Sequence, residues 1–158
     1  MRSILGAILA TFIALQAGAE AADPVGTKLT PKLKELLANE MQQIDEATAE
    51  LTRAIAGGDH ARVMKLGAAI SDSFILKRSL TEQDKKDLMS VVPPEFVALD
   101  RYFHGTAGKL AHAAEIKDSE LQGFYFYRML GTCVACHTRF ASDRFPGLGE
   151  EHSDRREH

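Results

Sequence analysis

The sequence predicts an all-α fold, an antiparallel four-helix bundle with a short extra connector helix. Apolar residues recur at three- and four-residue steps through four long segments, which is the pattern of helices that bury one face. Short connections with helix caps, glycines or prolines separate these segments, and such connections place consecutive helices side by side. Strands are not predicted, because the β-branched pair Val91-Val92 is too short to form one.

The first two helices follow clear start signals. Thr30 is a predicted N-cap with Pro31 at the first helical position, and Gly57-Gly58 end the segment. Its apolar stripe consists of Leu33, Leu37, Met41, Ile44, Thr48, Leu51 and Ile55. Asp59 caps the second helix, which we expect to run to about Arg78. Its apolar face consists of Val63, Leu66, Ile70 and Phe74. Gly67 inside it indicates close packing against either a neighbouring helix or a cofactor.

The connector helix and the last two helices also have clear start and stop signals in the sequence. Thr81, with an acidic residue three positions on, starts a short helix that ends near Ser90, before Pro93-Pro94. The third helix spans 94–116, and its buried side consists of Phe96, Leu99, Phe103, Ala107, Leu110 and Ala114. Asp118-Ser119 cap the fourth helix, which should end near Ala141.

Composition and termini define one exported domain. The chain has 158 residues, 45% of them hydrophobic and 26% charged, and a net charge of −3, which favours neither nucleic acid nor an anionic membrane as a partner. Residues 1–21 have the pattern of a cleaved signal peptide: Arg2, an apolar run to Leu15, then small residues. The run is about a dozen residues, short of the ~20 that span a bilayer. We therefore expect a periplasmic protein with a bundle domain at 22–141, an extended lead-in to Leu29 and a flexible polar tail at 142–158.

The motif Cys133-Val134-Ala135-Cys136-His137 contains both cysteines of the chain. This spacing is the attachment signature of a c-type haem, in which two thiols form thioethers and the histidine ligates iron. On a helix, positions three apart share one face, with the fourth beside them. The motif therefore predicts one covalent haem c held by Cys133, Cys136 and His137.

Three other uses of the cysteines fit the sequence less well. A thioredoxin-like redox pair needs a preceding strand, and none is predicted. A structural zinc site needs four ligands, and the chain has no second cysteine pair. A disulfide is geometrically feasible, although the surrounding sequence is typical of a regular helix.

A helical bundle with Cys133, Cys136 and His137 on its last helix resembles the class II cytochromes c, the cytochrome c-prime superfamily. The resemblance covers nearly all of the bundle domain. It implies that His137 is the proximal iron ligand and that the first helix covers the opposite haem face. Low-spin members place a methionine there, whereas c-prime members leave iron five-coordinate. The sequence is most similar to the low-spin, methionine-ligated group.

Met41 is the residue on which this distinction depends. Periodicity alone assigns it to the core, because methionine is a common core filler. The resemblance makes it the candidate distal ligand, and a thioether opposite histidine raises the reduction potential. Met129 lies one turn before Cys133 on the helix of the proximal ligand, so it cannot easily reach the opposite haem face, and Met64 and Met89 are expected in the core or on the surface.

Further residues were weighed as surroundings of a haem. His104 and His112 are expected to be satisfied or exposed rather than ligands, and His60 to be exposed. Apolar walls are candidates among Phe74, Phe103, Phe124, Tyr125 and Tyr127. Propionate partners are candidates among Arg128, Arg139 and Arg144, each of which fits a solvated face equally well.

The function that these expectations favour is one-electron transfer between redox partner proteins. A five-coordinate haem protein that binds a diatomic gas such as nitric oxide is the first alternative. A haem-free helical interaction domain is the second. Enzymatic activity is not predicted, since no nucleophile–base pair, carboxylate dyad or phosphate-binding loop is evident. The resemblance also leaves a homodimer open.

Overall fold

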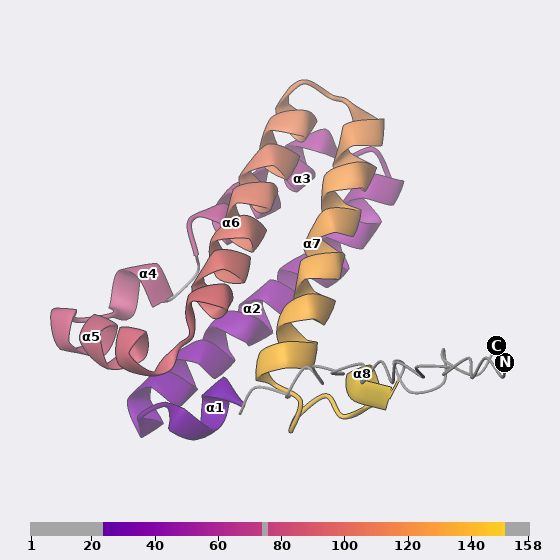
Figure 1. The fold of residues 1–158 in the computed structure, drawn as a ribbon. Coiled ribbons are helices and arrows are strands. Elements are labelled where there is room, and N and C mark those ends of the chain that lie inside the picture. Colours follow the sequence, from indigo (N-terminus) through magenta and orange to yellow (C-terminus); the bar gives the residue numbers. More distant parts are fainter. Residues whose placement is uncertain (1–23, 74–75, 151–158) are drawn as a thin grey trace, which may run out of the picture.

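The structure, a computed structural model, describes residues 24–73 and 76–150. All regular secondary structure in these ranges is α-helical, and the helices pack as a bundle (Figure 1). The predicted fold class is therefore confirmed. The predicted signal peptide, residues 1–21, lies outside the described residues.

Four of the helices build the body of the bundle: α2 (Pro31–Ala56), α3 (His60–Ser71), α6 (Pro94–Glu115) and α7 (Ser119–Phe140). The chain turns back between α6 and α7 through residues 116–118, so that these helices lie side by side (Figure 1). The connector contains α4 (Leu76–Ser79) and α5 (Glu82–Val91), which project to one side of the bundle. The connector helix predicted from the sequence is thus present as α5.

The helix starts follow the predicted caps. Each cap oxygen accepts a backbone N–H three residues on: Thr30 from Leu33 at 3.3 Å, Asp59 from Arg62 at 3.0 Å and Asp118 from Leu121 at 2.9 Å. Thr81 and Asp84 form a reciprocal capping box at the start of α5. Local sequence therefore sets where these helices begin.

Three sequence-based boundaries are wrong. The lead-in contains the short helix α1 (Val25–Lys28) instead of extended chain, and the tail contains α8 (Gly147–Glu150). The second bundle helix ends at Ser71 and does not reach Arg78, because Ser73 adopts a left-handed backbone conformation with φ of 59°. The predicted contribution of Phe74 lies outside the described residues, as does the end of the tail at 151–158.

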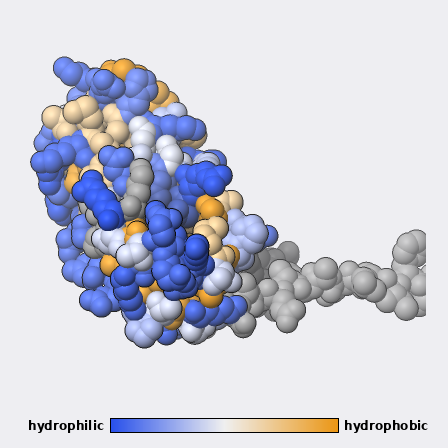
Figure 2. All heavy atoms as spheres, turned by 90° about the vertical axis from the view of Figure 1, so that its left-hand side faces the viewer, coloured by the Kyte–Doolittle hydropathy of each residue, from blue (hydrophilic) through white to orange (hydrophobic). Residues whose placement is uncertain are grey.

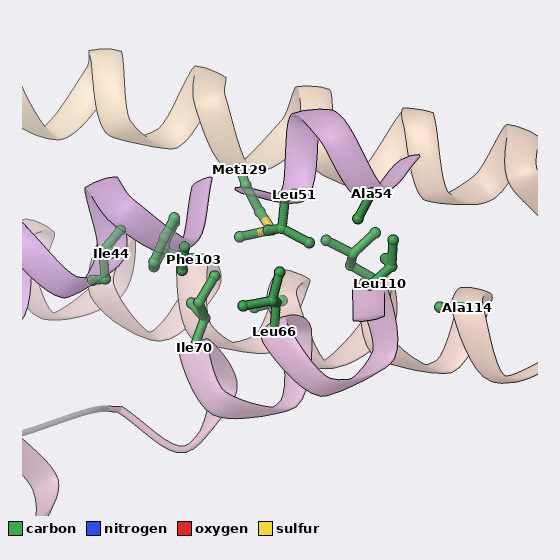
Figure 3. Packing of buried hydrophobic residues seen from close by; sticks show 12 residues of the cluster. Ile44, Leu51, Ala54, Leu66, Ile70, Phe103, Leu110, Ala114 and Met129 are labelled. Carbon is green, nitrogen blue, oxygen red and sulfur yellow. The ribbon is translucent and has the colours of Figure 1, made fainter. Parts of the chain in front are cut away.

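The larger of two hydrophobic clusters, the first cluster, lies where α2, α3, α6 and α7 meet. Its buried members are Ile44, Ala47, Leu51, Ala54, Val63, Leu66, Ile70, Phe103, Ala107, Leu110, Ala114 and Met129. Figure 3 shows the side chain of Met129 from α7 directed at Leu51 of α2, with Leu66 and Ile70 of α3 beneath them. Met129 is thus a buried core residue on the inner face of α7.

Close packing of α3 against α6 depends on Gly67. A Cβ atom at this position would lie 3.0 Å from the backbone oxygen of Ala107 and 3.0 Å from the backbone nitrogen of Ala111. Any side chain there would push the two helices apart. Of the two interpretations left open for Gly67, packing against a neighbouring helix is the one observed.

The second cluster lies at the other end of the bundle. Its buried members are Val25, Leu29, Leu33, Val92 and Phe140. Half-buried apolar side chains surround these five, among them Leu37 of α2, Leu99 of α6 and Cys136 of α7. Phe96 and Phe140 meet edge to face with ring centroids 5.5 Å apart. The second cluster thus packs the N-terminal part of the described chain, from Val25 to Leu33, against Phe140 in the last turn of α7.

The outer surface is mainly hydrophilic on the side that carries α4 and α5 (Figure 2). Among the described helices, none combines the length and apolar composition needed to cross a bilayer.

Candidate functional site

The Cys-x-x-Cys-His motif lies within the last two turns of α7. The helix is continuous from Ser119 to Phe140, so it has no break at the motif. Residues three apart on a helix have Cβ atoms about 5–6 Å from one another on one face. Cys133 and Cys136 therefore point to the same side of α7, as the haem-attachment spacing requires.

The two cysteines lie where the first and second clusters meet. Cys133 packs against the first cluster and Cys136 against the second, and both side chains are half-buried. We call this boundary the seam, and it is bordered by Leu37 and Ile44 on α2, Leu99 and Phe103 on α6, and Cys133 and Cys136 on α7. The two cysteines thus pack against apolar side chains of the bundle, whereas Val134 of the motif is exposed.

Both cysteines are free thiols in a setting that keeps them protonated. Burial raises the pKa of Cys133. Burial, the negative charge of Asp100 and the neighbouring Cys133 together raise the pKa of Cys136 to about 11. A zinc or iron–sulfur site needs thiolates, which this environment disfavours. A neutral S–H, by contrast, is the group that adds formally across a vinyl double bond to form a thioether.

A disulfide between the cysteines does not agree well with the local backbone. Disulfide bonds require a specific torsion and a specific approach of the two Cβ atoms. In α7 both cysteines have regular helical geometry, and the helix continues to Phe140. The structure shows the two thiols unpaired.

His137 is oriented by an aromatic stack. Its ring lies parallel to the ring of Phe145, with centroids 4.1 Å apart and an interplanar angle of 4°. Stacking covers one face of the imidazole, while the nitrogens at the ring edge make no hydrogen bond to any described residue. The stack therefore fixes the ring plane without using a nitrogen.

The imidazole of His137 is kept neutral. Burial, and then the positive charge of Arg144, lower the pKa of His137 below its ordinary value. A neutral imidazole has one ring nitrogen with a free lone pair, which is the form that ligates a metal. Sequence reasoning placed Arg144 near the motif but missed Phe145. An aromatic residue directly before Pro146 in a polar tail was the signal available.

Exposed apolar side chains lie on the same face of α7 as His137. Leu130, Val134 and His137 are spaced i, i+4 and i+7, and the two apolar residues are 40% and 51% exposed. Single exposed apolar residues are common, but a run along one face marks a contact surface. His137 is thus part of an apolar strip on the surface of α7.

Met41 lies on α2 at the level of the seam. It falls between Leu37, which packs against the second cluster, and Ile44 of the first, and its own side chain is 37% exposed. It belongs to neither cluster, so the core position that periodicity assigned to it is wrong. Met41 is therefore partly exposed on α2 and not enclosed in either cluster.

Sequence reasoning missed the carboxylate next to Met41. The Glu40 side chain is fully buried, where it accepts hydrogen bonds from Ser73 Oγ at 2.8 Å and from Leu76 N at 3.1 Å. These bonds join α2 to the end of α3 and the start of α4. Its neighbours in sequence, Asn39 and Met41, give no sign of this role, and only its spacing from Leu33 and Ile44 on the buried face indicated it.

The other methionines and histidines behave mostly as predicted. Met64 and Met89 are exposed. His104 is satisfied, because Nδ1 donates to the carbonyl of Ile70 at 2.5 Å. His112 is exposed and pairs with Glu115.

The prediction for His60 is wrong. It is half-buried, and the buried Gln122 donates Nε2–H to its Nδ1 at 2.9 Å. Gln122 is 62 residues away in sequence, so no local pattern around His60 indicated this partner.

The aromatic and arginine candidates divide between the core and the surface. Phe103 is buried in the first cluster and Tyr125 packs against it, whereas Phe124 and Tyr127 are exposed. The guanidinium of Arg128 donates from Nε and Nη2 to Tyr102 Oη. Arg139 and Arg144 are exposed near the motif.

The described residues offer few donors for a metal ion by itself. Nowhere in residues 24–73 and 76–150 do three His, Cys, Asp or Glu side chains converge as a metal site. The motif instead combines two neutral thiols, one neutral imidazole and surrounding apolar surface. This donor set fits a haem, which carries its own four nitrogen ligands, better than a bare ion.

Comparison with known proteins gives no match: neither a protein-family model, nor a curated protein, nor a solved structure is similar to the chain.

Proposed function

We propose that this protein is an exported c-type cytochrome that transfers single electrons between redox partner proteins. One haem is attached through Cys133 and Cys136, and His137 is the proximal iron ligand. The observation that carries the proposal is the continuous α7 helix. It presents two neutral thiols on one face, followed by a neutral imidazole with unbonded ring nitrogens.

The residues of the motif have separate tasks in this proposal. The bound haem supplies a one-electron couple at its iron. Cys133 and Cys136 hold the group through two thioethers, so it stays attached through many electron transfers. His137 provides a ring nitrogen, and Phe145 holds the imidazole plane by stacking. The apolar side chains against which Cys133 and Cys136 pack would limit the contact of a bound haem with water.

Met41 is the proposed distal ligand. Support comes from its position at the level of the seam and from its partial exposure, in addition to its place on the first long helix. A thioether ligand stabilises the reduced iron and raises the reduction potential. A six-coordinate iron of this kind is suited to electron transfer, since it has no open position for a gas.

Export is part of the proposal. The pattern of residues 1–21 is that of a cleaved signal peptide, and the periplasm is the compartment we assign. The neutral thiols fit cysteines that form thioethers with haem and not a disulfide with each other.

The optical spectra of the purified protein and of Met41→Ala test the ligand assignment. We expect the oxidised wild-type protein to be low-spin, with the absorption of a methionine–iron bond at the red end of the spectrum. Met41→Ala should become high-spin and bind carbon monoxide after reduction. Met64→Ala is the matched control, because Met64 is a similarly exposed methionine on α3.

A high-spin wild-type spectrum, unchanged by Met41→Ala, would contradict ligation by Met41. Rapid carbon monoxide binding by the reduced wild-type protein would then favour the five-coordinate, gas-binding alternative.

A further inference from the structure

A groove runs between α6 and α7 on a face of the bundle that the proposed function does not use. Two adjoining hollows of about 270 and 400 Å³ share Lys109 and Tyr125 and so form one continuous depression. Along α6 it extends from Tyr102 to Ile116, which corresponds to about 21 Å of helix at 1.5 Å per residue. This length suits a helix of about four turns better than a compact small molecule.

The groove exposes large apolar side chains. Tyr102 of α6, Ile116 directly after α6, and Leu121 and Phe124 of α7 are between 37% and 55% exposed. At Gly105, which also lines the groove, an added Cβ would meet nothing within 4 Å, so the floor is open to an incoming side chain. Contiguous apolar exposure of this kind marks an interaction surface in a soluble protein.

The charges at the groove are positive. Lys109 and Arg128 line it, and none of its lining residues is an Asp or Glu; the lining residue His112 pairs with Glu115. The chain as a whole has a net charge of −3, so the groove is a basic site on an acidic protein. Complementarity therefore favours an acidic occupant.

Arg128 is held in place before any partner binds. Its Nε and Nη2 donate to Tyr102 Oη at 2.8 and 2.5 Å, and its guanidinium carbon lies 5.6 Å from the centre of that ring. A guanidinium has five N–H donors, so these two bonds leave others for a carboxylate. A pre-oriented cation loses little entropy on binding.

A second copy of the chain does not fit this groove. A two-fold symmetric contact would bring Lys109 and Arg128 of both copies to one interface, where like charges repel. An asymmetric contact with the acidic residues of α2 in another copy would require a ring or an open filament of copies. A second copy therefore fits the groove less simply than a different protein does.

We propose that the α6–α7 groove binds an acidic amphipathic helix of a partner protein. Apolar side chains of that helix, spaced i, i+3 or i+4 and i+7, occupy the hollows, and its carboxylates pair with Lys109 and Arg128. The inference uses no residue of the haem-attachment motif, so it does not depend on the proposed function.

Two synthetic peptides of about 18 residues test the inference, one with leucines on one face and glutamates on the other, and a twin with lysines in place of glutamates. Fluorescence anisotropy measures their affinity for the purified protein. The glutamate peptide should bind, and its affinity should fall as salt is added. Lys109→Glu/Arg128→Glu should weaken it about tenfold or more, and Phe124→Ala should weaken it without changing the salt dependence.

Lys34→Glu/Lys86→Glu is the matched control, since it changes the same net charge at exposed lysines of α2 and α5. It should leave the affinity within about twofold of wild type, because screened charges away from the groove contribute little. Absent binding of the glutamate peptide, equal binding of the lysine peptide, or equal losses in both double variants would overturn the inference. Circular dichroism of each variant checks that it is folded.

Discussion

The two hydrophobic clusters of the bundle are packed differently. In the first cluster, side chains from four helices are buried, and Gly67 lets the backbones of α3 and α6 approach closely. The second cluster has few fully buried members and a surround of half-buried apolar residues, including Cys136. The first cluster is thus closely packed by residues of the chain itself. In the second cluster, apolar side chains stay partly exposed, as a site that takes up a haem would require.

Matched leucine substitutions on one helix test this contrast most strongly. Leu51 of the first cluster and Leu33 of the second both lie on α2, with exposed fractions of 0% and 1%. Leu51→Ala should lower the free energy of unfolding by about 4 kcal/mol and Leu33→Ala by about 2 kcal/mol, because a loosely packed site collapses more readily around a cavity. Urea denaturation followed by circular dichroism measures both values. Equal losses, or a larger loss for Leu33→Ala, would show that the clusters are packed alike.

Two glycine substitutions should have smaller effects on the free energy of unfolding, and these two effects should be opposite in sign. Gly67→Ala should cost about 1–3 kcal/mol, since its Cβ would be 3.0 Å from backbone atoms of α6 that cannot move aside singly. Gly105→Ala on α6 is the control, because a Cβ there meets nothing within 4 Å. It should stabilise the protein by about 0.5–1 kcal/mol through helix propensity. A neutral Gly67→Ala would mean that close approach of α3 and α6 does not organise the first cluster.

The smallest effect concerns His104, which lies on α6 one residue from the seam. Burial disfavours its protonation, but the Asp100 carboxylate, the Ile70 carbonyl and the charge of Glu40 together raise its pKa above the ordinary 6.5. The charged histidine therefore stabilises the fold fully below pH 6.5, and this contribution is lost as pH rises through the folded-state pKa. The urea midpoint of the wild-type protein should fall as the pH rises above 6.5, and that of His104→Gln should not show this fall. An unchanged pH profile would contradict the assigned pKa shift.

Local chemistry explains why much of the fold was predictable. Thr30, Asp59, Thr81 and Asp118 cap helices through bonds to residues three positions away, so the sequence contains both partners. Apolar periodicity likewise identified the buried side of α6, from Phe103 to Ala114.

The errors arise where distant residues decide the local structure. The second bundle helix ends early at a left-handed Ser73 that donates its hydroxyl to Glu40, 33 residues before it. His60 is tied to Gln122, far along the chain. No window of sequence around Ser73 or His60 contains these partners.

In the candidate site, too, the features set by local sequence were predictable and those set by tertiary packing were not. Spacing alone placed Cys133, Cys136 and His137 on one helix, and the structure agrees. The stack of Phe145 on His137 was not predicted, because the turn after α7 has no periodic pattern. Met41 was a candidate ligand because of the family resemblance, and its partial exposure between the two clusters became visible only in the packing of α2.

The mass of the denatured protein tests the central claim most directly. The protein is produced with export in a host that attaches haem to a second c-type cytochrome expressed beside it, which serves as the positive control. We predict that the wild-type chain carries the added mass of one haem after denaturation, and that Cys133→Ala/Cys136→Ala carries none. A wild-type mass equal to that of the polypeptide alone, with the control cytochrome fully loaded, would contradict the account.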